Sequence, residues 1–139
     1  MSARAVSSET IHATAVAIAG RCVLLTGRSG SGKSDLALRL IDRGAILVGD
    51  DYVRLERDGT RLLASPAPNI AGKIEMRGIG IVDTPFLDRV PVALCCDLDA
   101  APPRLPQPEA RSLAGIFVPV LALAALEPSA PLKVEAALA

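Results

Sequence analysis

The first strand-like stretch of the chain, Thr10–Ala19, alternates between two sets of positions. Alternate residues of a strand point to opposite faces of a sheet. One face of this predicted strand carries Ile11, Ala13, Ala15, Ala17 and Ala19. Arg21–Thr26 (RCVLLT) follows as a short apolar run, typical of a strand buried on both faces. A tight turn at Gly20-Arg21 is predicted to join the two strands.

The next segment, Lys33–Arg43, has the spacing of an amphipathic helix, with Gly44 at the position where glycine commonly ends a helix. The apolar positions of this helix are Leu36, Ala37, Leu40 and Ile41. Ala45–Gly49 (AILVG) is predicted to be a second buried strand. A right-handed crossover would make it parallel to Arg21–Thr26, with both carboxyl ends at one sheet edge, where α/β proteins bind ligands.

The second half of the chain is rich in predicted strands. Asp58-Gly59 is a strong hairpin signal between two such strands. The predicted strands are Tyr52–Glu56, Arg61–Ser65, two pieces within Lys73–Asp83, Val90–Cys96, Gly115–Val118 and Val120–Ala124. Ala101–Pro108 is predicted to be an extended connector and Leu132–Ala139 a short closing helix. The expected fold is one α/β domain with a mixed sheet, covering residues 10–139 after a flexible N-terminus of residues 1–9.

The composition of the chain argues against some classes of function. The 139 residues have zero net charge and 2% aromatic residues, which argues against a nucleic-acid binder. Three cysteines are an odd number for a disulfide framework, and free thiols fit the reducing cytoplasm. The longest uncharged stretch, Ser112–Leu126, is interrupted by Pro119 and is shorter than the ~20 residues of a membrane-spanning helix. We therefore expect a cytoplasmic protein without a membrane segment.

Candidate chemistry begins with GRSGSGKS, which matches the phosphate-binding pattern G-x-x-x-x-G-K-[ST]. The candidate nucleotide-binding residues are Gly27, Arg28, Ser29, Gly30, Ser31, Gly32, Lys33 and Ser34. Backbone N–H groups and the helix N-terminus would bind phosphate oxygens, Lys33 would reach the β- and γ-phosphates, and Ser34 would bind Mg²⁺. The alternative is an ordinary glycine-rich turn. The flanking apolar strand and amphipathic helix favour the P-loop.

The acidic pair Asp50-Asp51 ends the predicted strand Ala45–Gly49, as in a metal-binding Walker-B element. One carboxylate is expected to bind the magnesium shell and the other to orient a nucleophile. The residues alone leave open which does which. The alternative is an acidic turn.

The stretch KIEMRGIG interleaves a carboxylate, a guanidinium and two glycines. Glu75 is a candidate metal ligand, and Arg77 could bind phosphate oxygens with its planar fork. A glycine-punctuated strand turn is an equal alternative. His12 is the only histidine, and a lone histidine is more often structural or merely exposed.

These motifs together resemble the catalytic domain of bacterial HPr kinase/phosphorylase. That family has a histidine followed by a strand, a GxSGxGKS loop, an apolar strand ending in Asp-Asp, and an ExRGxG signature. Here they are His12, GRSGSGKS (Gly27–Ser34), LVGDD (Leu47–Asp51) and EMRGIG (Glu75–Gly80), and their order and spacing match over Thr10–Asp83.

The resemblance implies a P-loop fold of the phosphoenolpyruvate-carboxykinase-like kind and ATP- and Mg²⁺-dependent phosphorylation of a serine on HPr, the phosphocarrier of the sugar phosphotransferase system. It also implies the reverse phosphorolysis and a homo-oligomer. Matched by position, Asp50 is the catalytic acid/base, with Asp51 and His12 as its neighbours. Lys33 and Ser34 take the Walker roles, and Glu75 is a magnesium ligand.

The sequence departs from the family pattern in two places. Full-length members carry a separate N-terminal domain, for which this sequence has no counterpart. They also carry a basic loop with a PGRN-like core before the last helix, whereas this chain has Glu127–Lys133 (EPSAPLK), without arginine. Both features indicate a short form, better suited to the kinase reaction than to phosphorolysis.

Two other functions stay open at this level. One is a P-loop kinase for a small molecule, which would usually carry an arginine-rich lid. The other is a catalytically idle nucleotide-sensing module that regulates a partner. The missing arginine loop favours the second alternative, and the acidic residues Asp50, Asp51 and Glu75 speak against it.

Overall fold

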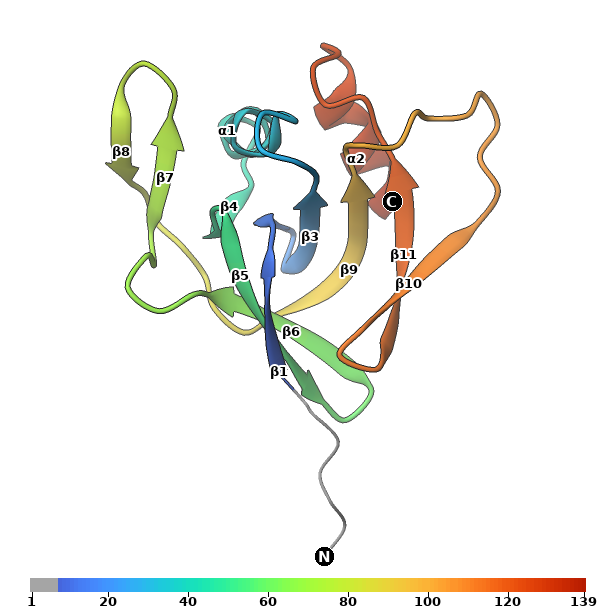
Figure 1. Ribbon diagram of the computed structural model, residues 1–139, viewed down its shortest axis with the longest axis horizontal. Helices are drawn as coiled ribbons and strands as arrows, with labels where there is room; N and C mark the ends of the chain where they lie inside the picture. Colours follow the sequence, from blue (N-terminus) through green and yellow to red (C-terminus); the bar gives the residue numbers. More distant parts are fainter. Residues whose placement is uncertain (1–7) are drawn as a thin grey trace, which may run out of the picture.

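A computed structural model of the chain describes residues 8–139 (Figure 1). Most of the predicted flexible N-terminus, residues 1–7, lies outside the described residues. Ser8 and Glu9 belong to the first strand, where they pair with Glu56 and Leu55.

The described residues form an α/β fold with one large mixed sheet, a separate two-stranded hairpin and two helices. The strands are β1 (Ser8–His12), β2 (Thr14–Ile18), β3 (Arg21–Thr26), β4 (Ile46–Gly49), β5 (Tyr52–Asp58), β6 (Arg61–Pro66), β7 (Lys73–Met76), β8 (Gly80–Asp83), β9 (Val90–Asp97), β10 (Glu109–Leu113) and β11 (Ile116–Ala122). The helices are α1 (Lys33–Asp42) and α2 (Ala130–Leu138). The sheet order is β1-β5-β6-β9-β3-β2-β4, with β11 also on β9 and β10 on β11.

The strand before α1 and the strand after it run in the same direction, as predicted, but they are not neighbours. β2 lies between β3 and β4 and pairs with both in the antiparallel sense. β9 is the parallel neighbour of β3 on its other side. The carboxyl ends of β3, β4 and β9 consequently meet at one edge of the sheet.

The predicted strand Thr10–Ala19 is two strands in the structure, β1 and β2, with Ala13 between them. β1 pairs with β5, whereas β2 pairs with β3 and β4, so the chain passes from one part of the sheet to another at Ala13. The alternating pattern does not record this change, because small alanines fit either face. The turn after β2 is formed by Ala19 and Gly20, both with positive φ, one residue earlier than predicted.

The second half contains the predicted strands, except that Gly115–Val118 and Val120–Ala124 are one strand, β11, and it also contains a strand that the pattern did not indicate. β10 pairs with β11 in a hairpin whose turn contains Ala114 and Gly115, so Gly115 belongs to a turn and not to a strand. β7 and β8 form a hairpin apart from the main sheet, beside α1 in Figure 1. The closing helix α2 begins two residues before the predicted start.

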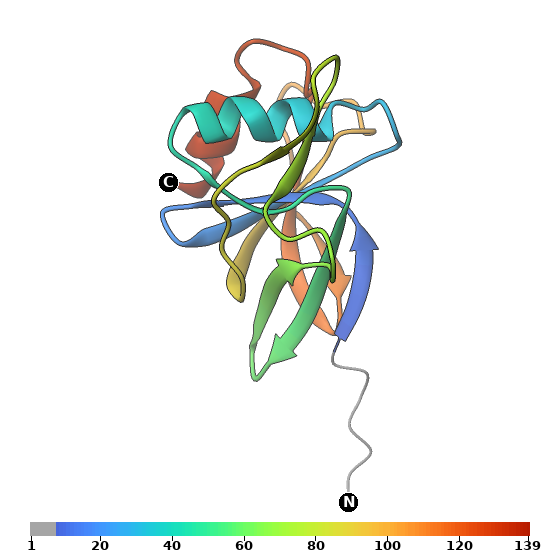
Figure 2. The same cartoon turned by 90° about the vertical axis from the view of Figure 1, so that its left-hand side faces the viewer.

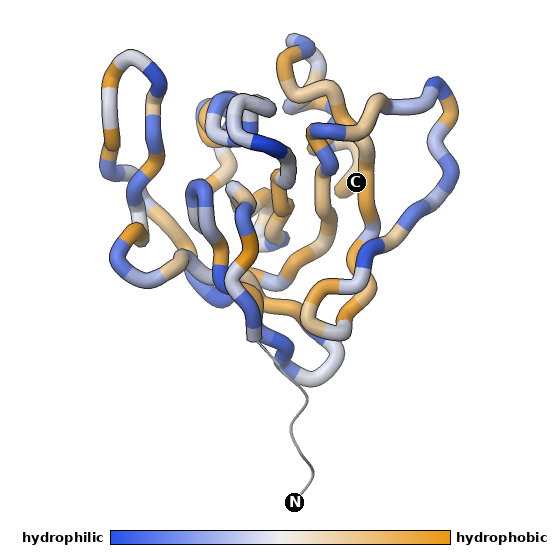
Figure 3. Tube along the Cα trace, in the orientation of Figure 1, coloured by the Kyte–Doolittle hydropathy of each residue, from blue (hydrophilic) through white to orange (hydrophobic). Residues whose placement is uncertain are grey.

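The apolar core divides into two clusters on the two faces of the sheet. The first packs both helices against the sheet through residues such as Leu36, Leu40 and Val134. The second lies between the central strands and the β5–β6 hairpin and includes Leu24, Val53 and Leu55. Figure 2 shows both helices on the same side of the strands, and Figure 3 shows apolar residues concentrated along the central strands.

Buried side chains include all three cysteines, Cys22, Cys95 and Cys96, which are free thiols on β3 and β9. Burial raises the pKa of the Cys96 thiol to about 12 and the pKa of Cys22 still further. These thiols are therefore core side chains, as predicted, and are not activated nucleophiles. In the described part of the chain, neither helix is long and apolar enough to cross a membrane.

Candidate functional site

The glycine-rich loop, Gly27–Ser34, joins the end of β3 to the first turn of α1. The backbone before α1 requires glycine at two points. A Cβ on Gly27 would lie 2.5 Å from the Ser31 hydroxyl oxygen. Gly32 has a φ of 98°, and a Cβ there would contact Ala125 and Leu126 at 3.2 Å. The loop is thus tightly packed against itself and against the chain that follows β11.

The helix start leaves hydrogen-bond donors free for a ligand. The first N–H groups of a helix have no intrahelical acceptor, and Gly32, which precedes α1, provides no side-chain cap for them. The Ser31 hydroxyl oxygen is buried and has no hydrogen-bond partner among the described residues. An oriented set of N–H and O–H groups at a helix N-terminus is suited to bind an anion.

Lys33 is the buried cation of the loop, at 7% exposure. Its ammonium nitrogen donates hydrogen bonds to the carbonyl oxygens of Gly27, at 2.8 Å, and Arg28, at 3.0 Å. The charge therefore lies inside the loop and does not extend into solvent. A buried ammonium held only by carbonyl oxygens lacks a counter-anion, which a phosphate group would supply.

Asp50 follows β4 and is also 7% exposed. Its Oδ1 accepts hydrogen bonds from the hydroxyls of Ser34, at 2.7 Å, and Thr14, at 2.9 Å. Its Oδ2 accepts the backbone N–H of Glu75 at 2.9 Å. One carboxylate thus connects the glycine-rich loop, β2 and β7.

Asp51 points away from this cluster because of a turn in the backbone. The Tyr52 N–H donates to the Asp50 carbonyl at 2.8 Å, which closes a γ-turn around Asp51, whose φ is 68°. A γ-turn with positive φ is rare and strained, and such strain is concentrated at functional sites. The Asp51 carboxylate is exposed and lies 2.7 Å from Nε2 of His12. The turn gives the two adjacent aspartates different environments.

In the part of the chain that the structure describes, the hairpin β7–β8 contacts the candidate site through its backbone and not through its side chains. Glu75 is exposed, and it contacts the site through its backbone N–H, which donates a hydrogen bond to Asp50. Arg77 lies in the exposed turn of the hairpin and forms no hydrogen bond or ion pair with another described residue. The structure therefore brings His12, Lys33, Ser34, Asp50, Asp51 and the Glu75 backbone to one edge of the sheet, while the Arg77 side chain has no contact there.

The predicted metal ligands are Ser34, Asp51 and Glu75. In the structure Ser34 contacts Asp50, while Asp51 contacts His12. No group of three or more His, Cys, Asp or Glu side chains in residues 8–139 is gathered closely enough to hold a metal. Mg²⁺ normally takes only one or two carboxylates and completes its shell with water and substrate phosphates. The hydroxyl and carboxylate oxygens of Ser34 and Asp50 are the kind of ligand it prefers.

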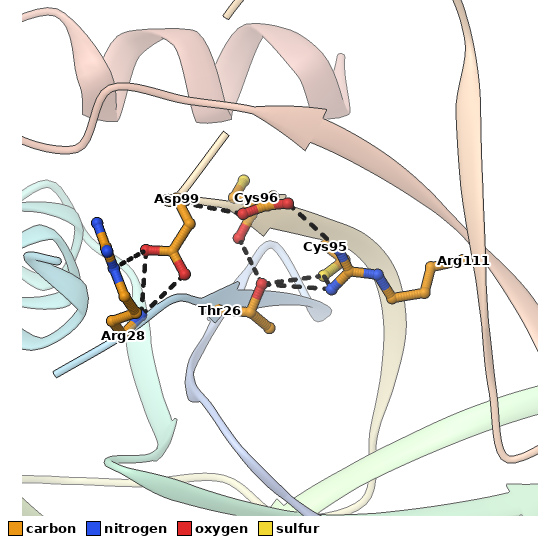
Figure 4. Close-up of polar contacts among 7 residues, drawn as sticks. Thr26, Arg28, Cys95, Cys96, Asp99 and Arg111 are labelled. Carbon is orange, nitrogen blue, oxygen red and sulfur yellow. Dashed lines mark hydrogen bonds and ion pairs between the residues drawn. The ribbon is translucent and has the colours of Figure 1, made fainter. Parts of the chain in front are cut away.

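Three polar residues near the site, Thr14, Asp97 and Asp99, were missed in the sequence. Thr14 is fully buried, and besides its bond to Asp50 its hydroxyl accepts the Asp51 N–H at 3.3 Å. A single buried threonine in an apolar strand gives no signal. Asp97, Asp99 and Arg111 lie around the end of β9, and Figure 4 labels Asp99 and Arg111 there. The apolar run before Asp97 resembles the run before Asp50 and could have indicated them.

Comparisons with known proteins decide the family. Residues 4–87 match the family described as the HPr Serine kinase C-terminal domain. The chain belongs to this family. The HPr kinase family match includes the glycine-rich loop, the acidic pair and the β7–β8 hairpin.

Relatives within the family agree with this assignment. The HPr kinase/phosphorylase of Alkaliphilus metalliredigens is 48% identical over 79 residues, 56% of this chain and 26% of the relative. That of Peptoclostridium acidaminophilum is 44% identical over 84 residues, 60% of this chain and 27% of the relative. The chain thus matches about a quarter of the length of these curated relatives.

A solved structure supports the assignment over nearly the whole chain. The Hpr(Ser) kinase/phosphatase from Coxiella burnetii is 32% identical, with a TM-score of 0.79, and 92% of each chain is covered. The mixed α/β fold is therefore that of an HPr kinase structure. The structural match extends beyond residue 87, where the family match ends.

Proposed function

We propose that this chain is an ATP- and Mg²⁺-dependent serine kinase domain that acts on HPr or an HPr-like phosphocarrier protein. The observation that carries the proposal is the hydrogen bond between Ser34, in the glycine-rich loop, and Asp50, at the end of β4. It joins a candidate phosphate-binding loop to a candidate proton acceptor. Family membership and the names of the relatives supply the substrate.

In this proposal the glycine-rich loop binds the nucleotide phosphates. The uncapped N–H groups of the first helical turn and the Ser31 hydroxyl would donate hydrogen bonds to phosphate oxygens. The Lys33 ammonium would exchange its carbonyl partners in the loop for phosphate oxygens of higher charge. The N–H groups of the helix start would not need to move for the phosphates to bind, which would lower the reorganisation cost of phosphoryl transfer.

Magnesium binding is proposed on the oxygen ligands of the site. Ser34 and Glu75 would hold the ion, with Asp51 as a further candidate. When bound, Mg²⁺ supplies positive charge that offsets the charge developing on the transferred phosphoryl group. The other residues of the site position the reactants.

Asp50 is proposed to receive the substrate serine. Its carboxylate would accept a hydrogen bond from the serine hydroxyl and then the proton, while the oxygen attacks the γ-phosphorus and the bond to the ADP oxygen breaks. Thr14 and the Glu75 N–H would hold the carboxylate in place during this step. Asp51 and His12 form the neighbouring pair. The three free buried thiols support a reducing, cytoplasmic setting.

The test is phosphate transfer from radiolabelled ATP by the purified chain, with HPr, without protein substrate, and with HPr in which the acceptor serine is replaced by alanine. We expect label on HPr that requires both Mg²⁺ and the serine. Nucleotide binding without turnover would indicate a sensing module, and turnover unaffected by HPr would indicate a small-molecule kinase. Either result would overturn the proposal.

A further inference from the structure

Asp99, just after β9, contacts the glycine-rich loop from a strand that the loop motif does not include (Figure 4). Its two carboxylate oxygens both accept the backbone N–H of Arg28, at 3.2 and 3.1 Å. Its Oδ1 also lies 3.4 Å from Nε of Arg28. The side-chain pair is exposed and by itself contributes little, whereas a carboxylate bond to a backbone N–H fixes the path of the main chain.

The same carboxylate packs against the first residue of the loop. A Cβ on Gly27 would lie 3.3 Å from Asp99 Oδ1. Lys33 binds the carbonyl oxygens of Gly27 and Arg28. The start of the loop is therefore held by a cation at its carbonyl groups and by an anion at the Arg28 N–H.

Asp99 is itself held in place by neighbouring residues. Its N–H donates to Oδ1 of Asp97 at 3.0 Å, and Oδ2 of Asp97 accepts a bond from Arg111 at 3.3 Å. Arg111 comes from β10, is partly buried, and also lies 3.5 Å from the Thr26 hydroxyl at the end of β3. A series of hydrogen bonds thus connects β10, the end of β9 and the glycine-rich loop.

We propose that Asp99 is a positioning residue that holds the glycine-rich loop in the conformation that binds phosphate, and that the Asp97–Arg111 pair orients it. The inference rests on the proposed nucleotide-binding function of the loop. It assigns two opposing effects to one side chain. The hydrogen bond to Arg28 orders the loop, whereas the negative charge opposes the phosphates nearby.

Two variants with the same charge separate these effects. Asp99→Asn removes the charge and the ion pair with Arg28 but retains an acceptor oxygen, whereas Asp99→Ala removes the acceptor as well. The difference between them therefore measures the loss of the acceptor at equal charge, together with the packing of the side chain against Gly27. Asp58→Ala, in the β5–β6 hairpin, is the control for loss of one exposed acidic residue in an ion pair.

The first measurement uses no nucleotide. Trypsin cleavage after Arg28 is followed by mass spectrometry, because an ordered loop resists cleavage and Arg28 is exposed. We expect Asp99→Ala to be cleaved about fivefold faster than Asp99→Asn, in line with the loss of one hydrogen bond. The melting temperature of each variant is measured alongside, so that faster cleavage from global unfolding is recognised.

The second measurement is the dissociation constant of Mg-ATP by calorimetry. We expect Asp99→Ala to bind about fivefold more weakly than Asp99→Asn, and Asp99→Asn to bind at least as tightly as the wild type. Equal cleavage rates or equal dissociation constants for the two variants would overturn the assignment. A wild-type protein that does not bind ATP would overturn the proposed function, while the cleavage rates would still report whether Asp99 orders the loop.

Discussion

At the scale of single residues, the site separates two adjacent aspartates by one strained turn. Asp50 is buried and accepts three hydrogen bonds, whereas Asp51 is exposed and contacts His12. The γ-turn lies at Asp51 itself, where the carboxylate contacts His12 and takes no part in the hydrogen bonds around Asp50. Removal of one carboxylate should thus affect chemistry differently from removal of the other.

Asp50→Asn tests which carboxylate accepts the proton. Asparagine keeps an oxygen for the Thr14 and Ser34 hydroxyls but cannot act as a base, so we expect nucleotide binding and fold to persist. Phosphate transfer to HPr should fall by about 10²–10⁴, the usual contribution of general base catalysis. Asp51→Asn is the matched variant and should retain more activity. A normal rate in Asp50→Asn with loss in Asp51→Asn would show that the two roles are reversed.

Lys33→Ala tests the loop cation. The Lys33 ammonium lies inside the loop and binds two loop carbonyl oxygens. The other cation of the loop, Arg28, is exposed and its side chain pairs with Asp99. We expect phosphate transfer to fall by about 10²–10³, the usual effect of removing one group that stabilises transition-state charge. Calorimetry should show weaker ATP binding. Lys133→Ala, an exposed lysine of α2, is the control, and wild-type turnover in Lys33→Ala would contradict the site assignment.

At the scale of elements, the sequence predicts best where the pattern is local. The helix α1 and the strands β3 and β9 are found within a residue of their predicted ends, because a buried apolar run or a 3.6-residue period determines each one. The passage from β1 to β2 at Ala13 was missed because it depends on pairing with distant strands. β10 was missed because EARSL lacks a clear apolar face, and it forms by pairing with β11.

The same distinction applies to the candidate site. The glycine-rich loop, the acidic pair and the ExRGxG signature are contiguous motifs and could be predicted. Thr14 and Asp99 act through hydrogen bonds to residues 36 and 71 positions away, which no local pattern records. The hydrogen bond from the β7 backbone to Asp50 could not be predicted either, because at Glu75 the motif indicates a role only for the side chain.

Glu75→Gln separates the backbone role of β7 from its side-chain role. The substitution keeps the N–H that donates to Asp50, so the position of that carboxylate should not change. It removes one anionic oxygen ligand, and we expect the Mg²⁺ concentration for half-maximal transfer to rise several-fold. A magnesium titration at saturating ATP is the measurement. An unchanged magnesium requirement would show that Glu75 acts only through its backbone.

At the scale of the whole molecule, the chain after β11 lies against the glycine-rich loop. Gly32 packs beside Ala125 and Leu126, and Arg39 of α1 donates hydrogen bonds to the carbonyl oxygens of Ala125 and Glu127. The stretch Glu127–Lys133 follows directly and begins α2. Residues far apart in the sequence are thereby brought to the edge of the candidate site, and we expect the charges of this stretch to affect the direction of the proposed reaction.

We expect the forward kinase reaction to be faster than phosphorolysis. Phosphorolysis places inorganic phosphate beside a phosphoserine, and two anions in one site repel each other unless cations neutralise them. In Glu127–Lys133 the one cation, Lys133, is paired with Glu127 at 2.9 Å. Arg111 pairs with Asp97 at 3.3 Å, which opposes its movement into the site. Arg77 remains as the exposed guanidinium on the hairpin beside Asp50.

The measurement is pyrophosphate release from serine-phosphorylated HPr with Mg²⁺ and millimolar phosphate, compared with the forward rate under matched conditions. We expect the reverse rate to be lower by at least about tenfold, since lysine in an ion pair cannot replace a free bidentate arginine. Ser129→Arg, which adds a guanidinium to this stretch, should raise the reverse rate more than the forward rate, with Ser129→Gln as the uncharged control. Equal forward and reverse rates in the wild-type protein would show that the existing cations are sufficient for phosphorolysis.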